Sequence, residues 1–138
     1  MDSLPMSILL IDDDPHVGRI FELVMGHYQL PLTVMDDAEV AIQYLQTNHP
    51  DIIVVDLFLP GTDGYQVLDH IRKAESIRHC TVVATTAYYT SDSQQEILAR
   101  GFDGYLPKPF DTKRIVPYLR SLLGKKTNRD DLPARDDE

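Results

Sequence analysis

The chain has 138 residues, of which 43% are hydrophobic and 25% charged, and its formal net charge is −9. This length suits one domain with its own core, and the composition is that of a globular protein and not of a disordered chain. The negative charge argues against nucleic acid and against an anionic membrane as direct partners, because both would repel the chain.

Five short apolar segments predict β-strands, and they alternate with segments of helical pattern. The strands are predicted at residues 7–11, 32–35, 52–55, 81–85 and 104–107. The first, third and fourth are almost unbroken in hydrophobicity, which is typical of strands that helices cover on both faces. The last contains a proline, so it suits the edge of a sheet.

Apolar residues recur at helical spacing between these strands. Four stripes are clear: Val17, Ile20, Phe21 and Val24; Ala38, Ala41, Ile42 and Leu45; Val67, Leu68 and Ile71; Ile115, Leu119 and Leu122. Asp63 is placed to cap the third helix, and Asp111 or Thr112 to cap the last. Pro117 falls inside that last helix and predicts either a kink or a later helix start.

One further helix, predicted at residues 91–100, has a thin apolar stripe. Only Ile97 and Leu98 are strongly apolar there, and Gly101 follows as a helix end. We expect this helix to be the least firmly docked element, because it has little apolar surface to bury.

Five β-then-α units predict an α/β fold, with a parallel sheet, helices on both faces and right-handed crossovers. After Gly124 the apolar periodicity is lost. We therefore expect one domain over residues 6–124 and a disordered tail over 125–138. Residues 1–6 carry no secretory signal and no apolar run is long enough to span a bilayer, so we expect a cytoplasmic protein.

Charged and hydroxyl side chains follow the predicted strands at their carboxyl ends. They are the run Asp12-Asp13-Asp14, then Asp56, Thr86 and Lys108. Ligands of doubly wound sheets bind at this edge. Two carboxylates about 4 Å apart repel by roughly 4 kcal/mol, so the gathered acids need either a cation or a raised pKa. Hard oxygen ligands favour Mg²⁺ as the cation. A metal-bound aspartate can attack phosphorus, while a lysine and a threonine hold other phosphoryl oxygens.

The chain from residue 6 to residue 123 resembles the receiver domains of two-component response regulators. Four segments carry the resemblance: ILLIDDDP at 8–15, DLFLPGTDG at 56–64, Thr86-Ala87, and KPF at 108–110. It implies a flavodoxin-like (βα)5 fold with strand order 2-1-3-4-5.

The resemblance also implies residue roles at the metal. Asp56 would accept the phosphoryl group, and Asp12 and Asp13 would bind Mg²⁺ together with Asp56 and the backbone carbonyl of Phe58. Asp14 is expected to cap the first helix instead of binding metal.

The remaining implied roles concern the phosphoryl group and the switch. Thr86 would bond a phosphoryl oxygen, and Lys108, before a cis peptide to Pro109, would pair with it. Tyr105 matches an aromatic residue that rotates inward when Thr86 moves. The helix at 91–100, the strand at 104–107 and the last helix would form the switching face.

Phe58 and Tyr88 each lie two residues past a predicted site residue. In the family these positions border the path of the attacking water, so two bulky residues would shield an acyl phosphate and prolong its lifetime. The alternative is that both are exposed aromatic residues without a kinetic role.

We therefore expect a stand-alone receiver that is not a turnover enzyme. A histidine kinase or phosphotransfer protein would donate to Asp56, and the phosphorylated form would bind a downstream protein or form a homodimer. A phosphatase with an aspartyl nucleophile would need a second acid where Phe58 stands. A pure interaction module is the other alternative, although all five site side chains are present.

Overall fold

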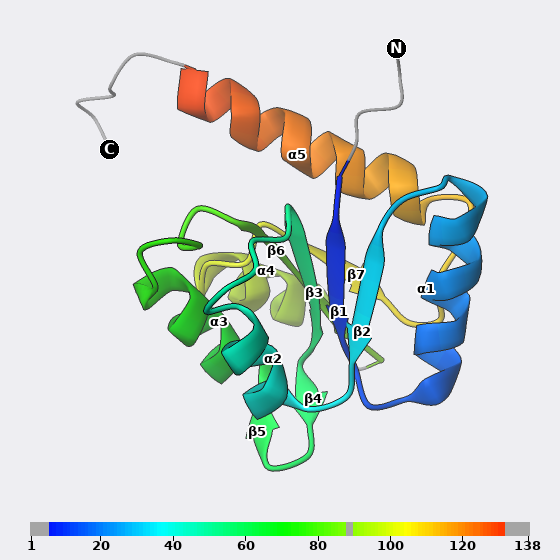
Figure 1. Cartoon of the computed structure of the whole chain (residues 1–138), viewed down its shortest axis with the longest axis horizontal. Coiled ribbons are helices and arrows are strands. Elements are labelled where there is room, and N and C mark those ends of the chain that lie inside the picture. The colour runs from blue at the N-terminus through cyan, green and yellow to red at the C-terminus, as the bar shows by residue number, and fades with distance from the viewer. Residues whose placement is uncertain (1–5, 88–89, 132–138) are drawn as a thin grey trace.

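Five parallel strands form one sheet, in the order β2-β1-β3-β6-β7 (Figure 1). The computed structural model describes residues 6–87 and 90–131. Numbered within this sheet alone, the order is the predicted 2-1-3-4-5, so the doubly wound α/β fold is confirmed. The strands are β1 (Ile8–Ile11), β2 (Leu32–Met35), β3 (Ile52–Asp56), β6 (Thr81–Thr86) and β7 (Gly104–Pro107).

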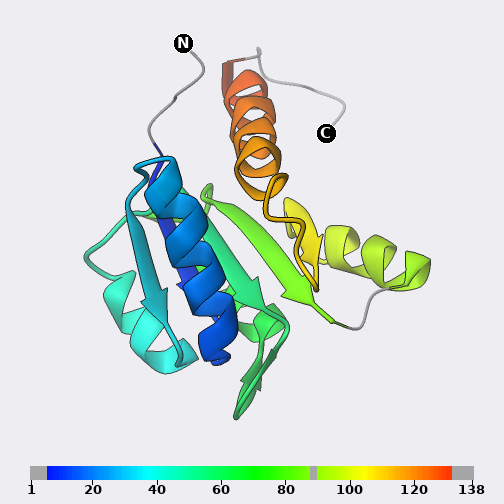
Figure 2. The same ribbon diagram turned by 90° about the vertical axis from the view of Figure 1, so that its right-hand side faces the viewer.

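Five helices cover both faces of the sheet (Figures 1 and 2). They are α1 (Pro15–His27), α2 (Ala38–Tyr44), α3 (Gly64–Lys73), α4 (Ser91–Ala99) and α5 (Ile115–Asp131). The predicted stripes of α1 and α5 pack against one face, and those of α2 and α3 pack, with Ile97 of α4, against the other. Ile42 of the predicted α2 stripe belongs to neither core. Within β1 the side chains alternate between the two cores, Ile8 and Leu10 in one and Leu9 and Ile11 in the other.

Aspartates begin three of these helices. Asp14, Asp37 and Asp63 cap α1, α2 and α3 through their side chains. The expected capping roles of Asp14 and Asp63 are therefore confirmed. Capping satisfies backbone N–H groups that have no partner in the first turn.

The helix α4 begins with a capping box, in which Thr90 and Ser93 each bond the backbone of the other. Ile97 is its one buried residue, while Leu98 is 47% exposed. This helix therefore has the small buried surface that its sequence predicted.

The helix α5 starts later than its predicted caps, Asp111 or Thr112, would place it, and it ends later than its apolar stripe. It begins at Ile115, so Pro117 falls in the first turn, where a missing N–H costs little. Asp111 lies before the helix and accepts a hydrogen bond from the backbone N–H of Lys113, so it does not cap α5. The helix continues to Asp131, past the predicted domain end at residue 124. Residues 132–138 lie outside the described part of the chain.

A two-stranded antiparallel hairpin, β4 (Phe58–Leu59) with β5 (Thr62–Asp63), connects β3 to α3. These two short strands were not among the predicted elements. Gly61 turns the hairpin with a φ of 76°, a conformation that glycine adopts without strain.

Candidate functional site

The predicted site residues lie at the carboxyl edge of the sheet. Asp12 follows β1, Asp56 ends β3, Thr86 ends β6 and Lys108 follows β7. Because β1, β3, β6 and β7 are consecutive neighbours in the parallel sheet, their ends bring these side chains to one place.

Two aspartates are buried at this edge and are held in the same way. Each uses Oδ1 to accept a hydrogen bond from the backbone N–H two residues later: Asp12 from Asp14 at 2.9 Å and Asp56 from Phe58 at 3.1 Å. Each directs Oδ2 to the ammonium of Lys108, at 3.0 Å for Asp12 and 3.4 Å for Asp56. The geometry therefore fixes both carboxylates while one cation serves the two.

Burial and neighbouring charges have opposing effects on the pKa values of Asp12 and Lys108. Burial raises the pKa of Asp12 above its ordinary 3.8, although the Asp14 N–H and Lys108 work against the rise, and the charge of Asp56 adds to it. Burial alone would lower the pKa of Lys108, but Asp12 and Asp56 outweigh it and raise that pKa above 10.5. Lys108 is therefore firmly charged, while burial makes the charged form of Asp12 less favourable than in an exposed aspartate.

A third carboxylate completes a set suited to a divalent cation. Ligand oxygens of Asp12, Asp13 and Asp56 lie within 4.8 Å of one another. The buried Oδ2 of Asp12 has Lys108 as an ionic neighbour but no well-formed hydrogen bond. Three carboxylates, one of them with a buried oxygen that lacks a hydrogen bond, fit Mg²⁺, which binds through a few carboxylates and keeps several waters.

Thr86 and Lys108 are tied together through their backbones. Thr86 is 1% exposed, and its carbonyl accepts a hydrogen bond of 2.9 Å from the Lys108 N–H. Lys108 precedes a cis peptide bond to Pro109, as the resemblance implied. This backbone hydrogen bond therefore holds the end of β6 to the start of the β7–α5 connection at the site.

Gly64 packs closely against the backbone at the end of β3. A Cβ at this position would lie 2.8 Å from the backbone oxygen of Asp56 and 3.0 Å from the Cα of Leu57. Only glycine fits without moving this segment, so the start of α3 packs directly against the backbone of Asp56.

The aromatic residue expected at the switch is half-buried on β7. The hydroxyl of Tyr105 donates to Oε1 of Gln94 at 2.8 Å, and its N–H donates to the hydroxyl of Tyr118 at 2.9 Å. Neither partner was singled out from the sequence, and no periodicity there could have marked them. Phe58 is 59% exposed, and Tyr88 lies outside the described residues.

The structure thus brings Asp12, Asp13, Asp56 and Lys108 into one cluster, with Thr86 at the same sheet edge. Tyr105 lies farther back along β7. Within the described residues no helix is both long and apolar enough to cross a membrane.

Comparison with known proteins assigns this arrangement to a family. The chain is 30% identical over 125 residues to the response regulator Rre1 of Synechocystis, which covers 88% of this chain and 53% of Rre1. It spans about half the length of several curated relatives that it matches.

Solved structures agree. A putative response regulator of Chloroflexus aurantiacus superposes with a TM-score of 0.81 at 27% identity, over 88% of this chain and 99% of that one. The receiver domain of the sensor histidine kinase PA1611 of Pseudomonas aeruginosa has a TM-score of 0.78 at 27% identity, over 88% and 99%, and holds magnesium in its active-site cleft. The family model of the response regulator receiver domain matches residues 8–120, so this chain belongs to that family of two-component signalling domains.

Proposed function

We propose that this receiver domain accepts a phosphoryl group on Asp56 from a histidine kinase or phosphotransfer protein in a Mg²⁺-dependent reaction. One observation carries the proposal: two buried aspartates share the ammonium of Lys108, at 3.0 and 3.4 Å, with Asp13 beside them. Such a cluster has more negative charge than its lysine neutralises. It is therefore prepared to receive a cation together with a phosphoryl group.

The residues divide the chemistry among them. A carboxylate oxygen of Asp56 forms a bond to phosphorus as the bond from phosphorus to the donor histidine nitrogen breaks, and that nitrogen keeps the electron pair. Lys108 neutralises one phosphoryl oxygen and the hydroxyl of Thr86 bonds another. The Phe58 N–H keeps Asp56 oriented through its Oδ1.

Asp12, Asp13, Asp56 and the backbone carbonyl of Phe58 would hold the metal. When bound, Mg²⁺ supplies the positive charge that offsets the phosphoryl oxygens. Asp12 and Asp13 contribute by holding that charge beside the acceptor, and they do not attack phosphorus themselves.

Phosphorylation would change which protein this domain binds. We place it on the face formed by α4, β7 and α5, where Thr86 would move toward the phosphoryl group and Tyr105 would follow. A downstream protein or a second copy of the chain would bind there. The small buried surface of α4 supports this choice, because weakly docked elements are the ones that move at low energetic cost.

Intact mass spectrometry after incubation with acetyl phosphate and Mg²⁺ tests the proposal. We expect one added phosphoryl group in the wild-type chain and none in Asp56→Asn or after chelation of the metal. Asp69→Asn is the matched control, because it removes one carboxylate from an exposed position on α3. A chain that stays unmodified while folded would instead be an interaction module. Equal modification of Asp56→Asn would place the acceptor elsewhere.

A further inference from the structure

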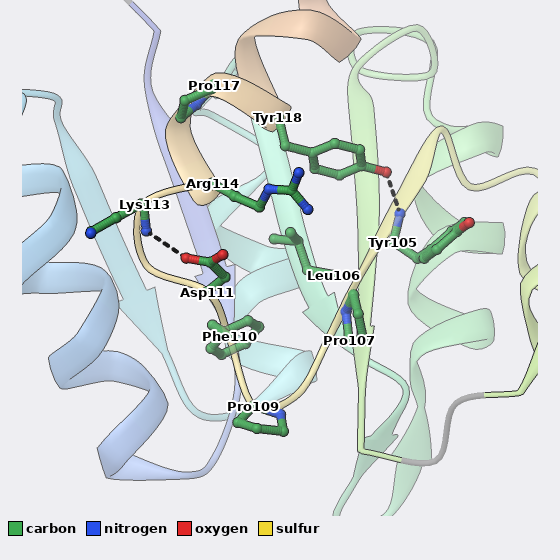
Figure 3. Close-up of a pocket in the computed structure, with 10 residues that line it drawn as sticks. All are labelled: Tyr105, Leu106, Pro107, Pro109, Phe110, Asp111, Lys113, Arg114, Pro117 and Tyr118. Carbon is green, nitrogen blue, oxygen red and sulfur yellow. Dashed lines mark hydrogen bonds between the residues drawn. The ribbon is translucent and has the colours of Figure 1, made fainter.

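Tyr105 is hydrogen-bonded to two helices at once. Its side-chain hydroxyl donates to Gln94 of α4, and its backbone N–H donates to the hydroxyl of Tyr118 of α5. Figure 3 shows the Tyr118 ring reaching β7, while the Tyr105 ring points away from it. One residue of the strand is therefore bonded to both helices of the proposed switching face.

The contact with α5 depends on a close approach of helix and strand. A Cβ on Gly104 would lie 2.6 Å from Cδ1 of Leu122, and the Tyr118 hydroxyl would also collide with it. Glycine thus lets α5 lie directly over the strand backbone. This approach brings the Tyr118 hydroxyl within 2.9 Å of the next amide, that of Tyr105.

The contact with α4 joins a helix that has few other attachments. Gln94 lies in the first half of α4, and Ile97 is the one residue that this helix buries. A hydrogen bond of 2.8 Å from Tyr105 is therefore a substantial part of what holds the start of α4 to the strand.

Tyr105 is also close to the phosphorylation site along the chain and across the sheet. It pairs with Ala84 of β6, two residues before Thr86, and Thr86 pairs with Pro107. The Lys108 N–H donates to the Thr86 carbonyl just beyond this pair. A displacement of β6 at the site is therefore passed to β7 through a continuous parallel ladder.

We propose that Tyr118 is a positioning residue that couples α5 to Tyr105, and that Gln94 is its counterpart on α4. A displacement of the β7 backbone then acts on α5 through the Tyr105 N–H, and a movement of the Tyr105 ring acts on α4 through its hydroxyl. This inference rests on the proposed function, since phosphorylation of Asp56 is what would move Tyr105.

Amide exchange on the full chain, with and without acetyl phosphate and Mg²⁺, tests the coupling. Tyr118→Phe keeps the ring and removes only the hydroxyl; Gln94→Met keeps the side-chain length and removes the acceptor. Tyr28→Phe and Gln95→Met are the matched controls, at the C-cap of α1 and on the exposed side of α4. Without phosphorylation we expect the Tyr105 amide to exchange about tenfold faster in Tyr118→Phe and at the wild-type rate in both controls.

After phosphorylation the two variants should show which helix responds through which hydrogen bond. In the wild-type chain we expect exchange to change in both α4 and the first turns of α5. Tyr118→Phe should keep the change in α4 and lose it in α5, and Gln94→Met should do the reverse. A phosphorylated Tyr118→Phe variant whose α5 responds like the wild type would overturn the coupling.

Failure of the proposed function is recognised separately, by mass. If no variant gains a phosphoryl group, the proposed function fails and the switching role fails with it. The exchange rate of the Tyr105 amide in the unmodified variants then still decides whether the Tyr118 bond exists. An unchanged rate in Tyr118→Phe contradicts the bond itself.

Discussion

Replacement of Asp12 by asparagine should stabilise the metal-free domain, although it removes an ion pair. The Asp12 side chain is fully buried, and its ligand oxygen lies within 4.8 Å of those of Asp13 and Asp56. At an effective dielectric near 20, each of these repulsions reaches about 3.5 kcal/mol, and the attraction of Lys108 at 3.0 Å returns about 5.5 kcal/mol. Burial of the charge adds a further cost, which is why the pKa of Asp12 is raised.

The direction of this effect follows from the linkage between proton binding and folding stability. A raised pKa means that the folded state binds a proton more tightly than the unfolded state, so the contribution of Asp12 to stability falls as pH rises from about 3.8 through the folded pKa. At pH values above the folded pKa that contribution is fully unfavourable, and asparagine avoids it. Because exposed Asp13 is partly screened, we expect a net gain of about 1–2 kcal/mol and a midpoint about 5 °C higher.

Thermal and urea unfolding in a metal-free buffer at pH 7 measure this gain, with Asp69→Asn as the control for net charge. Added Mg²⁺ should then reverse the advantage. At ten times the dissociation constant it stabilises the wild-type domain by about 1.4 kcal/mol, and it should stabilise the variant far less. An Asp12→Asn variant that unfolds more easily than the wild type without metal, or responds equally to Mg²⁺, would refute this reasoning.

Three other changes probe the same site. Lys108→Met leaves two buried carboxylates without their cation, so we expect the free energy of unfolding in urea at pH 7 to fall by about 3 kcal/mol. Because the pKa of Lys108 is raised in the folded state, this difference in stability from the wild type should hold up to about pH 10.5 and shrink above it. Phe58→Ala removes a side chain beside the acceptor, and mass spectrometry over time should show severalfold faster loss of the phosphoryl group; an unchanged rate would end the shielding hypothesis. Gly64→Ala inserts a methyl group 2.8 Å from the Asp56 carbonyl, so we expect about 2–3 kcal/mol lower stability and slower phosphorylation, and a stable, normally phosphorylated variant would argue against the close approach.

The sequence was sufficient to locate the strands of the sheet, because their hydrophobicity differs sharply from that of the flanking segments. The run from Ile52 to Val55 is unbroken and lies entirely in the core, so hydrophobicity alone located it. The gathering of Asp12 and Asp56 followed from parallel topology, since both end neighbouring strands. Local chemistry was equally readable where one side chain determines the outcome, as in the cap formed by Asp63.

Features that depend on packing could not be read in this way. The β4–β5 hairpin has two residues in each strand, too few for a period to appear. The far end of α5 has no apolar stripe, although the chain continues as a helix to Asp131. Gln94 and Tyr118 became notable only when the fold brought them to Tyr105, because nothing in their local sequence distinguishes them from surface residues.

The bond between Tyr118 and β7 also affects how this protein can associate. β7 is an outer strand, and an outer strand with free N–H groups can recruit a strand from another molecule. Here Pro107 has no N–H to offer, and the N–H of Tyr105 is already occupied by the Tyr118 hydroxyl. Extension of the sheet on this side is therefore blocked, and any complex formed on this edge must be built from side chains.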